Sequence, residues 1–304
     1  MQKLLRILRN ILLSLLGLIT VFLVLVNMSS VQTYLAQKAS TMLADKLKTK
    51  VAVQNVRIEL LNHVLLEGLY IEDHHQDTLA YIGKVELRIT DWFFLKPTTP
   101  VLHYVGLNNA FINLQRTATS PAWNYAFIED AFASPKSTKP KQSGSVELDL
   151  EKLMLDNVRV RMDDAWTGYD YDIDIGSLLT NVEEIDFTKK AIVVSRIDLA
   201  NSSIRLRDYK GGKPPTPKKP MVIDTTAFNP DEWTVNMGSI KLDDCHFRFV
   251  NKEGKPYPNE FDPEYIEVSR LNAEILDLRI VGDTLRARME HFSALERSGF
   301  EVKQ

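Results

Sequence analysis

The sequence of 304 residues has a single cysteine, Cys245, which excludes an internal disulfide and any site built from several cysteines, such as a zinc ribbon or an iron–sulfur cluster. It also has no excess of charge of either sign: 37 Lys and Arg stand against 40 Asp and Glu, a formal net charge of -3. Such a balance argues against nucleic-acid binding, which usually needs a basic surface. With 44% hydrophobic and 25% charged residues, the composition also excludes a disordered chain, collagen and a coiled coil.

The motifs of several common enzyme classes are missing as well. There is no Gly-x-Ser-x-Gly elbow, no Gly-rich phosphate loop and no His-Glu-x-x-His zinc helix. Asp170, Asp172 and Asp174 are spaced like the first three ligands of a calcium loop, but Ile175 stands where that loop needs glycine and Asn181 where it needs glutamate. We therefore expect an exposed strand face there, and no catalytic residue, metal site or cofactor in the chain.

The strongest local signal lies at the N-terminus, where residues 11–26 carry no charge. A spanning helix needs about 20 apolar residues, so this run reaches across a membrane with snorkelling ends. Lys3, Arg6 and Arg9 precede it, and the positive-inside rule keeps that end cytoplasmic. The predicted anchor consists of Ile11, Leu12, Leu13, Leu15, Leu16, Leu18, Ile19, Val21, Phe22, Leu23, Val24, Leu25 and Val26.

The alternative for this segment is a cleaved signal peptide. Residues 26–31 read Val-Asn-Met-Ser-Ser-Val, which lacks the small residues at alternating positions that cleavage requires. We therefore favour an uncleaved anchor within residues 1–28, and expect the chain from Ser29 onward to be exported under either interpretation.

Residues 29–49 follow as a separate segment, and within it residues 31–47 have the pattern of an amphipathic helix, with Ser29 or Ser30 as candidate N-cap. Tyr34 and Met42 lie beside the apolar stripe. Two interpretations remain open: the helix plugs the end of a sheet, or it lies on the membrane surface. The stripe consists of Val31, Leu35, Ala39, Leu43 and Leu47.

After residue 50 the hydrophobic period changes from about four to two. Apolar and polar residues alternate over residues 51–60, 85–89 and 169–175, and no later stretch has the pattern of a long amphipathic helix. Alternation marks strands with one apolar and one polar face. Residues 50–304 are therefore predicted to form a mainly antiparallel β-sheet with one apolar face.

An internal repeat runs through this region, over residues 105–114, 153–162, 197–206 and 240–249. Its leucines, Leu107, Leu155, Leu199 and Leu242, lie 48, 44 and 43 residues apart. In each copy the apolar side chains change between odd and even positions just after this leucine, mostly across an Asn/Asp pair. A strand that keeps one face buried must then bend, bulge or turn there. A propeller is the alternative for this period, but the Gly-His and Trp-Asp marks of its repeats are absent.

Three further features are expected to have structural roles. Cys245 stands where the other copies have Ala110, Val158 and Ser202, which predicts a small-residue packing position. His74 and His75 are adjacent, so on a strand they would point to opposite faces, and we expect a turn in solvent. The proline-containing stretches 134–144, 210–220 and 251–258 have the composition of solvated loops, although their lysines are also compatible with anionic lipid.

Several segments, in this order along the chain, resemble the N-terminal region of TamB-type (translocation and assembly module) proteins of the AsmA-like superfamily, in their Bacteroidetes form. These are the anchor and short helix followed by Lys50-Val-Ala-Val53, the Asp-rich turn Ile71–Tyr81, and Leu114-Gln-Arg116 followed by Trp123–Ile128. The last is residues 282–300, which end in Glu-Arg-Ser-Gly-Phe. The chain lacks the glycine often placed before the aromatic-flanked Asn124. Since such proteins are usually much longer, we expect Gln304 to lie within a longer β region.

The resemblance implies an extended, curled β-groove (a "β-taco") that rises from the bacterial inner membrane into the periplasm. Its apolar concave face would carry phospholipid acyl chains toward the outer membrane, with an outer-membrane β-barrel assembly protein as a possible partner. We expect no enzyme activity. The candidates for the lining of the groove are Val85, Leu87, Ile89, Ile112, Leu114, Val158, Val160, Met162, Ile204, Leu206, Phe247 and Phe249.

Two other functions are alternatives to lipid conduction. A membrane-tethered binding or adhesion module made of two β-sandwich domains would have closed, dry cores and no bound lipid. A hydrolase would need a nucleophile with a base partner, and no such pair is readable in the sequence.

Overall fold

A computed structural model describes residues 13–14, 17, 28–59, 62–89, 101–132, 147–186, 189–214, 229, 232–251, 257 and 260–303. The predicted anchor over residues 11–26 lies outside the described residues, apart from Leu13, Ser14 and Gly17. None of the helices in the described ranges combines the length and the apolar character needed to cross a membrane.

Helix α2, Ser29–Leu47, confirms the predicted amphipathic helix. Its N-cap is Met28, which makes no side-chain capping hydrogen bond, so the expectation of a serine cap was wrong. The helix ends where Lys48 adopts the left-handed conformation, with φ of 53°. Ala36 and Leu47 are buried on its inner side, whereas Tyr34 and Met42 are exposed.

The rest of the described chain is almost entirely β. One short helix, α3 (Ala126–Phe132), interrupts the strands. The strands are β1 (Val51–Ala52), β2 (Asn55–Glu59), β3 (His63–Glu72), β4 (Thr78–Ile89), β5 (Val101–Arg116), β6 (Glu147–Asp164), β7 (Tyr169–Asp186), β8 (Ala191–Ala200), β9 (Ser203–Asp208), β10 (Thr234–Asn251), β11 (Tyr265–Val281), β12 (Thr284–Glu296) and β13 (Glu301–Lys303).

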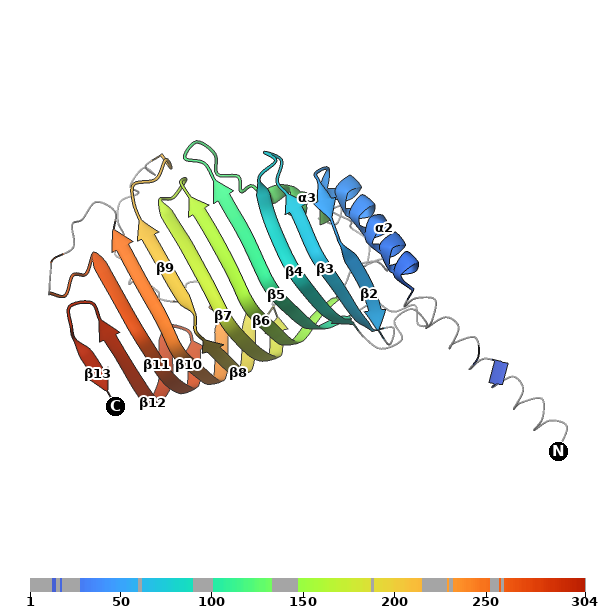
Figure 1. The fold of residues 1–304 in the computed structure, drawn as a ribbon. Helices are drawn as coiled ribbons and strands as arrows, with labels where there is room; N and C mark the ends of the chain where they lie inside the picture. The colour runs from blue at the N-terminus through green and yellow to red at the C-terminus, as the bar shows by residue number, and fades with distance from the viewer. Residues whose placement is uncertain are drawn as a thin grey trace, which may run out of the picture.

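All of these strands belong to one sheet, which follows the chain from β1 and β3 at one end to β12 and β13 at the other (Figure 1). The prediction of a mainly β chain is confirmed, but the sheet is mixed rather than antiparallel. Strand β6 runs parallel to β5, and β10 runs parallel to both β8 and β9. The sheet thus consists of antiparallel units, β3–β5, β6–β9 and β10–β12, that are joined by parallel pairs.

The parallel pairs bring equivalent residues of the repeat side by side. Leu107 is paired with Leu155, and Ile112 with Val160, where β5 meets β6. The same positions meet where β8 and β9 adjoin β10: Leu199 is paired with Leu242, and Ile204 with Phe247. The repeat read from the sequence is therefore the register of the sheet at both parallel junctions.

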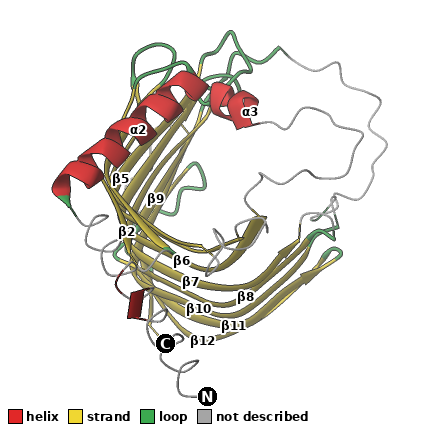
Figure 2. Ribbon diagram, turned by 90° about the vertical axis from the view of Figure 1, so that its right-hand side faces the viewer, coloured by secondary structure: helices red, strands yellow, loops and turns green. Residues whose placement is uncertain are grey.

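The predicted bend in each repeat is confirmed by the backbone. Asn109, Asn157, Asn201 and Asp244 have φ of 54°, 51°, 50° and 46°. These side chains are exposed, whereas the residue that follows each of them is buried: Ala110, Val158, Ser202 and Cys245. The left-handed residues thus lie on the outside of a crease in the sheet, and the apolar face lies on its inside. Seen end on in Figure 2, the sheet is curled into an open trough.

Candidate functional site: an apolar concave face

Side chains on the inside of the trough form continuous apolar rows that run across the strands. Residues paired between neighbouring strands point to the same side of a sheet, so the register shows which side chains share a row. One row contains Leu107, Leu155, Leu178, Leu199, Leu242 and Ala273. Beyond the crease lie Ile112, Val160, Ile173, Ile204, Phe247 and Val268, and then Leu114, Met162, Tyr171, Leu206, Phe249 and Ile266. We call this surface the concave face.

The residues predicted from the sequence to line a groove lie on the concave face, with one exception. Val85 is paired with Leu107 and Leu87 with Val105, which extends the rows onto β4. Ile89 lies beyond a shift in register between Arg88 and Ile89, so the ladder does not assign it to this face. The other predicted residues belong to the rows above or, as Val158 does, to the crease. The leucine row, Tyr171, Ile173, Ile266 and Val268 were missed. The repeat contains the signal for Leu107, Leu155, Leu199 and Leu242, and the alternation over residues 169–175 contains it for Tyr171 and Ile173. Neither pattern includes the other missed residues, Leu178, Ile266, Val268 and Ala273.

The concave face is only partly covered. Of the predicted lining residues, Val85 and Val158 are buried and the others are half-buried. In the described part of the chain, the largest side chain that is completely buried is the polar Asp73. The described strands therefore form one open sheet, without the dry core between two sheets that defines a sandwich.

Helix α2 closes one end of the concave face. Ala36 packs with Val53 and Val56, and the half-buried Leu66 and Leu69 of β3 join this cluster. Leu66 is paired with Val85, so the helix covers the same side of the sheet as the apolar rows. Of the two interpretations offered for this helix, the structure supports the one in which it plugs the end of the sheet.

No family model matches this chain, and no curated protein matches it significantly. Its function is therefore inferred from the geometry of its surfaces and from the sequence.

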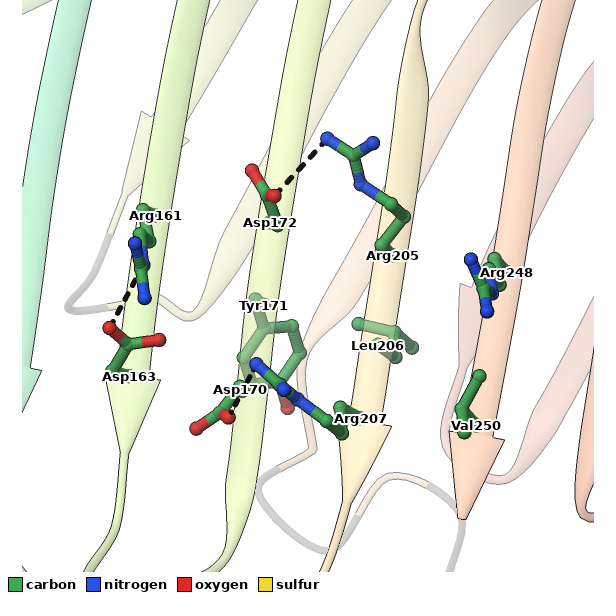
Figure 3. Close-up of a pocket in the computed structure, with 10 residues that line it drawn as sticks. All are labelled: Arg161, Asp163, Asp170, Tyr171, Asp172, Arg205, Leu206, Arg207, Arg248 and Val250. Carbon is green, nitrogen blue, oxygen red and sulfur yellow. Dashed lines mark ion pairs between the residues drawn. The ribbon is translucent and has the colours of Figure 1, made fainter. Parts of the chain in front are cut away.

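The opposite, convex face is polar and is crossed by ladders of ion pairs. Asp172 of β7 lies between Arg159 of β6 and Arg205 of β9, with N–O distances of 2.9 and 3.1 Å. Asp174 also pairs with both arginines, and Asp170 pairs with Arg207 at 3.1 Å. Asp170, Asp172, Arg205 and Arg207 are among the residues that line a hollow of about 490 Å³, which is drawn in Figure 3. Asp170, Asp172 and Asp174 thus lie on β7 and are paired with arginines of the neighbouring strands. Among the described residues, no group of side chains could hold a metal ion.

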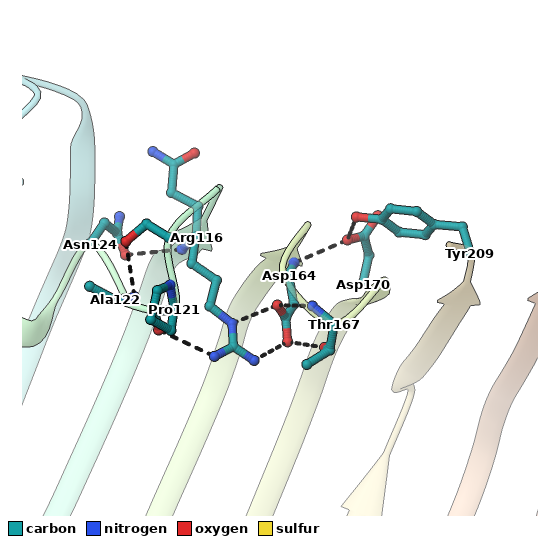
Figure 4. A network of polar contacts seen from close by, with 10 residues as sticks. Arg116, Pro121, Ala122, Asn124, Asp164, Thr167, Asp170 and Tyr209 are labelled. Atoms are coloured by element: carbon teal, nitrogen blue, oxygen red, sulfur yellow. Dashed lines mark hydrogen bonds and ion pairs between the residues drawn. The ribbon is translucent and has the colours of Figure 1, made fainter. Parts of the chain in front are cut away.

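A buried network fixes the rim at which β5, β6 and β9 end (Figure 4). The guanidinium group of Arg116 donates two hydrogen bonds of 2.6 Å to the carboxylate of Asp164. Burial alone would raise the pKa of Asp164, but the hydrogen bonds from Arg116 and Thr167 outweigh it and lower that pKa to about 2. Nearby, burial and a hydrogen bond to Asp170 raise the pKa of Tyr209 to about 12. These groups are positioned to hold strand ends together.

Two segments that carry the family resemblance meet at the same rim. Asp73, in the turn between β3 and β4, accepts hydrogen bonds from the backbone N–H groups of His75 and Asp77 and from the side-chain amide of Asn124. Burial opposes ionisation of Asp73, but these hydrogen bonds lower its pKa below the usual range. These hydrogen bonds join the turn between β3 and β4 to the segment around Asn124.

The remaining candidates also have structural roles. His74 and His75 lie in the predicted turn, and the ring of His74 stacks on Phe127 with 4.3 Å between centroids. The Sγ atom of Cys245 is buried beside the carbonyl oxygen of Leu199, at 3.6 Å, and burial raises the pKa of the thiol. The packing position predicted for Cys245 is confirmed.

Proposed function

We propose that this chain is an inner-membrane-anchored periplasmic protein that conducts phospholipid acyl chains along the concave face toward the outer membrane, in the manner of the TamB-type proteins it resembles. The observation that carries the proposal is the continuity of the half-buried apolar rows across β4 to β11. Exposed apolar surface of such extent usually marks a binding surface. Outer-membrane biogenesis, with a β-barrel assembly protein as partner, is the wider role that this proposal implies.

The dimensions of the concave face suit an acyl chain. The rows beyond the crease cross five strand-to-strand intervals, from β5 to β11, which at about 4.8 Å each gives roughly 24 Å. An acyl chain spans about half of a hydrocarbon core of about 30 Å. Each methylene transferred from water to this face contributes about 0.8 kcal/mol, and the chain can slide because the contact is non-directional.

The two faces of β5 allow a matched test of the proposal. Ile112 lies on the concave face, and its neighbour Asn113 is paired with Arg161 on the convex face. Ile112→Asp places a carboxylate among the apolar rows, where a hydrated charge should block the tails. Asn113→Asp places the same group on the polar side, beside an arginine.

The measurement is photo-crosslinking to phospholipid in cells, with a benzoylphenylalanine in place of Met162, together with native mass spectrometry of the extracted protein. We expect lipid adducts in the parent and in Asn113→Asp, and at least about a tenfold loss in Ile112→Asp, since a charge at the face opposes passage of the tails. Because the face is open to water, both variants should fold. Equal crosslinking in the two variants, or no lipid in the parent, would contradict the proposal and favour a tethered binding module.

A further inference from the structure

Helix α2 carries large exposed side chains on the side that faces away from the sheet. Tyr34 and Met42 are 63% and 61% exposed, while Ala36 and Leu47, on the inner side, are 2% and 4% exposed. The inner side alone accounts for the packing of the helix on β2 and β3. Packing on the sheet therefore does not account for Tyr34 and Met42.

The outer residues form a stripe of defined chemistry. Tyr34, Lys38, Met42 and Lys46 follow one another at intervals of four and therefore lie along one side of the helix. Tyrosine suits the membrane–water interface, and lysine can lay its apolar stem along lipid while its ammonium group stays in water. Asp45 is the only acidic residue of the helix, which leaves the exposed side with a small positive charge.

The position of α2 in the chain brings this stripe close to the predicted anchor. Only Asn27 and Met28 separate Val26 from the first residue of the helix. Three peptide units reach about 10 Å at most, so the start of α2 stays within that distance of the end of the anchor. The helix is also the outermost element at its end of the sheet (Figure 1).

We infer that α2 lies on the lipid surface of the inner membrane, with the stripe Tyr34–Lys38–Met42–Lys46 in the headgroup region. This inference rests on the proposed anchor. The two interpretations of the helix then apply to its opposite sides: one closes the end of the concave face and the other contacts lipid. This arrangement holds the β3 and β4 end of the concave face beside the bilayer, where a lipid would enter.

The test uses the full chain, reconstituted in vesicles of phosphatidylethanolamine and phosphatidylglycerol. Cys245→Ser removes the native thiol with little cost, because Ser202 occupies the equivalent position in the third copy of the repeat. A fluorophore is attached to a cysteine at Thr41, which lies on the exposed side of α2. Quenching by spin-labelled headgroups reports contact with the surface, and a fluorophore at Lys241, an exposed residue on β10, gives the background.

Met42→Glu and Gln37→Glu form the matched pair of variants. Both residues are exposed on α2 and both changes add one negative charge, but the positions lie about 140° apart around the helix. We expect quenching at Thr41 well above that at Lys241, at least about a twofold loss with Met42→Glu, since apolar contact and charge both contribute to interfacial binding, and little change with Gln37→Glu. Equal quenching in the two variants would mean that the tether alone creates the proximity, and it would overturn the inference.

A fluorophore at Thr20 separates this inference from the proposed function. Quenching of that fluorophore by lipids brominated in their acyl chains shows that the anchor is inserted. An inserted anchor with only background quenching at Thr41 would overturn the docking of α2 and leave the anchored protein intact. A fluorophore at Thr20 that is not reached by brominated chains would overturn the anchor, and the docking with it.

Discussion

At the scale of single residues, the crease depends on side chains that tolerate the left-handed conformation. Asn157 has φ of 51°, and its side-chain amide donates a hydrogen bond of 2.6 Å to Oδ1 of Asn109. Asparagine and aspartate reach this conformation more easily than other residues with a Cβ, and β-branched residues are the least suited. This explains why the changes between odd and even positions fall at Asn or Asp.

Replacing Asn157 separates the backbone contribution from the side-chain contribution. Asn157→Gly and Asn157→Val both remove the amide hydrogen bond, but only valine is strained at positive φ. We expect Asn157→Val to lower the free energy of unfolding by about 1–2 kcal/mol more than Asn157→Gly does. Urea denaturation of the two variants checks this, and equal stabilities would show that the left-handed conformation is not required at the crease.

Asp164 makes the stability of the rim dependent on pH. Its folded-state pKa of about 2 lies below the ordinary value of 3.8, so its ionised form stabilises the fold above pH 4, and that contribution is lost as the pH falls from 4 toward 2. The shift corresponds to about 2 kcal/mol. Asp164→Asn should lower stability at pH 7 and flatten the acid limb of a plot of stability against pH. An unchanged acid limb would show that other carboxylates dominate it.

At the scale of strands, the repeat was readable from the sequence, but the pairing of its copies was not predicted. The structure pairs equivalent residues at both parallel junctions, which lets the apolar rows continue from strand to strand. Strand direction was not predictable, since alternation with a period of two is the same in parallel and antiparallel strands. The sequence also did not indicate that the third copy of the repeat forms two strands, β8 and β9, although the left-handed Asn201 lies at the break between them. The prediction that Ser29 or Ser30 caps α2 was wrong because Ser29 is already the first residue of the helix and Met28 is its N-cap.

Gly176 of β7 tests how closely the strands approach at the crease. A Cβ added there would lie 2.4 Å from the carbonyl oxygen of Asn201, which is backbone and has little room to move. We expect Gly176→Ala to lower the free energy of unfolding by about 2–3 kcal/mol, whereas the adjacent Ser177→Ala should change it little because Ser177 is exposed. Thermal melting compares them, and similar midpoints would mean that the crease yields easily.

At the scale of the whole molecule, the described strands form a single curled sheet, and the described residues cover its apolar face only in part. The sequence predicted one apolar face and, beyond the crease, the side chains that β5, β6, β9 and β10 contribute to its rows. It did not show which way the sheet curls, because curvature arises from left-handed residues repeated in register across several strands. An open face of this kind has a thermodynamic consequence, since any ligand that covers it stabilises the folded state.

Phospholipid should therefore raise the melting temperature of the protein in proportion to its occupancy of the concave face. A ligand at a hundred times its dissociation constant adds about 2.7 kcal/mol, which for a chain of 304 residues corresponds to roughly 4 °C. We expect this rise with short-chain phosphatidylglycerol below its micellar concentration, in the parent and in Asn113→Asp. Ile112→Asp should melt normally without lipid and lose most of the rise with lipid. A parent protein whose melting temperature is insensitive to lipid would show that the apolar rows are not a lipid-binding surface, whatever else they bind.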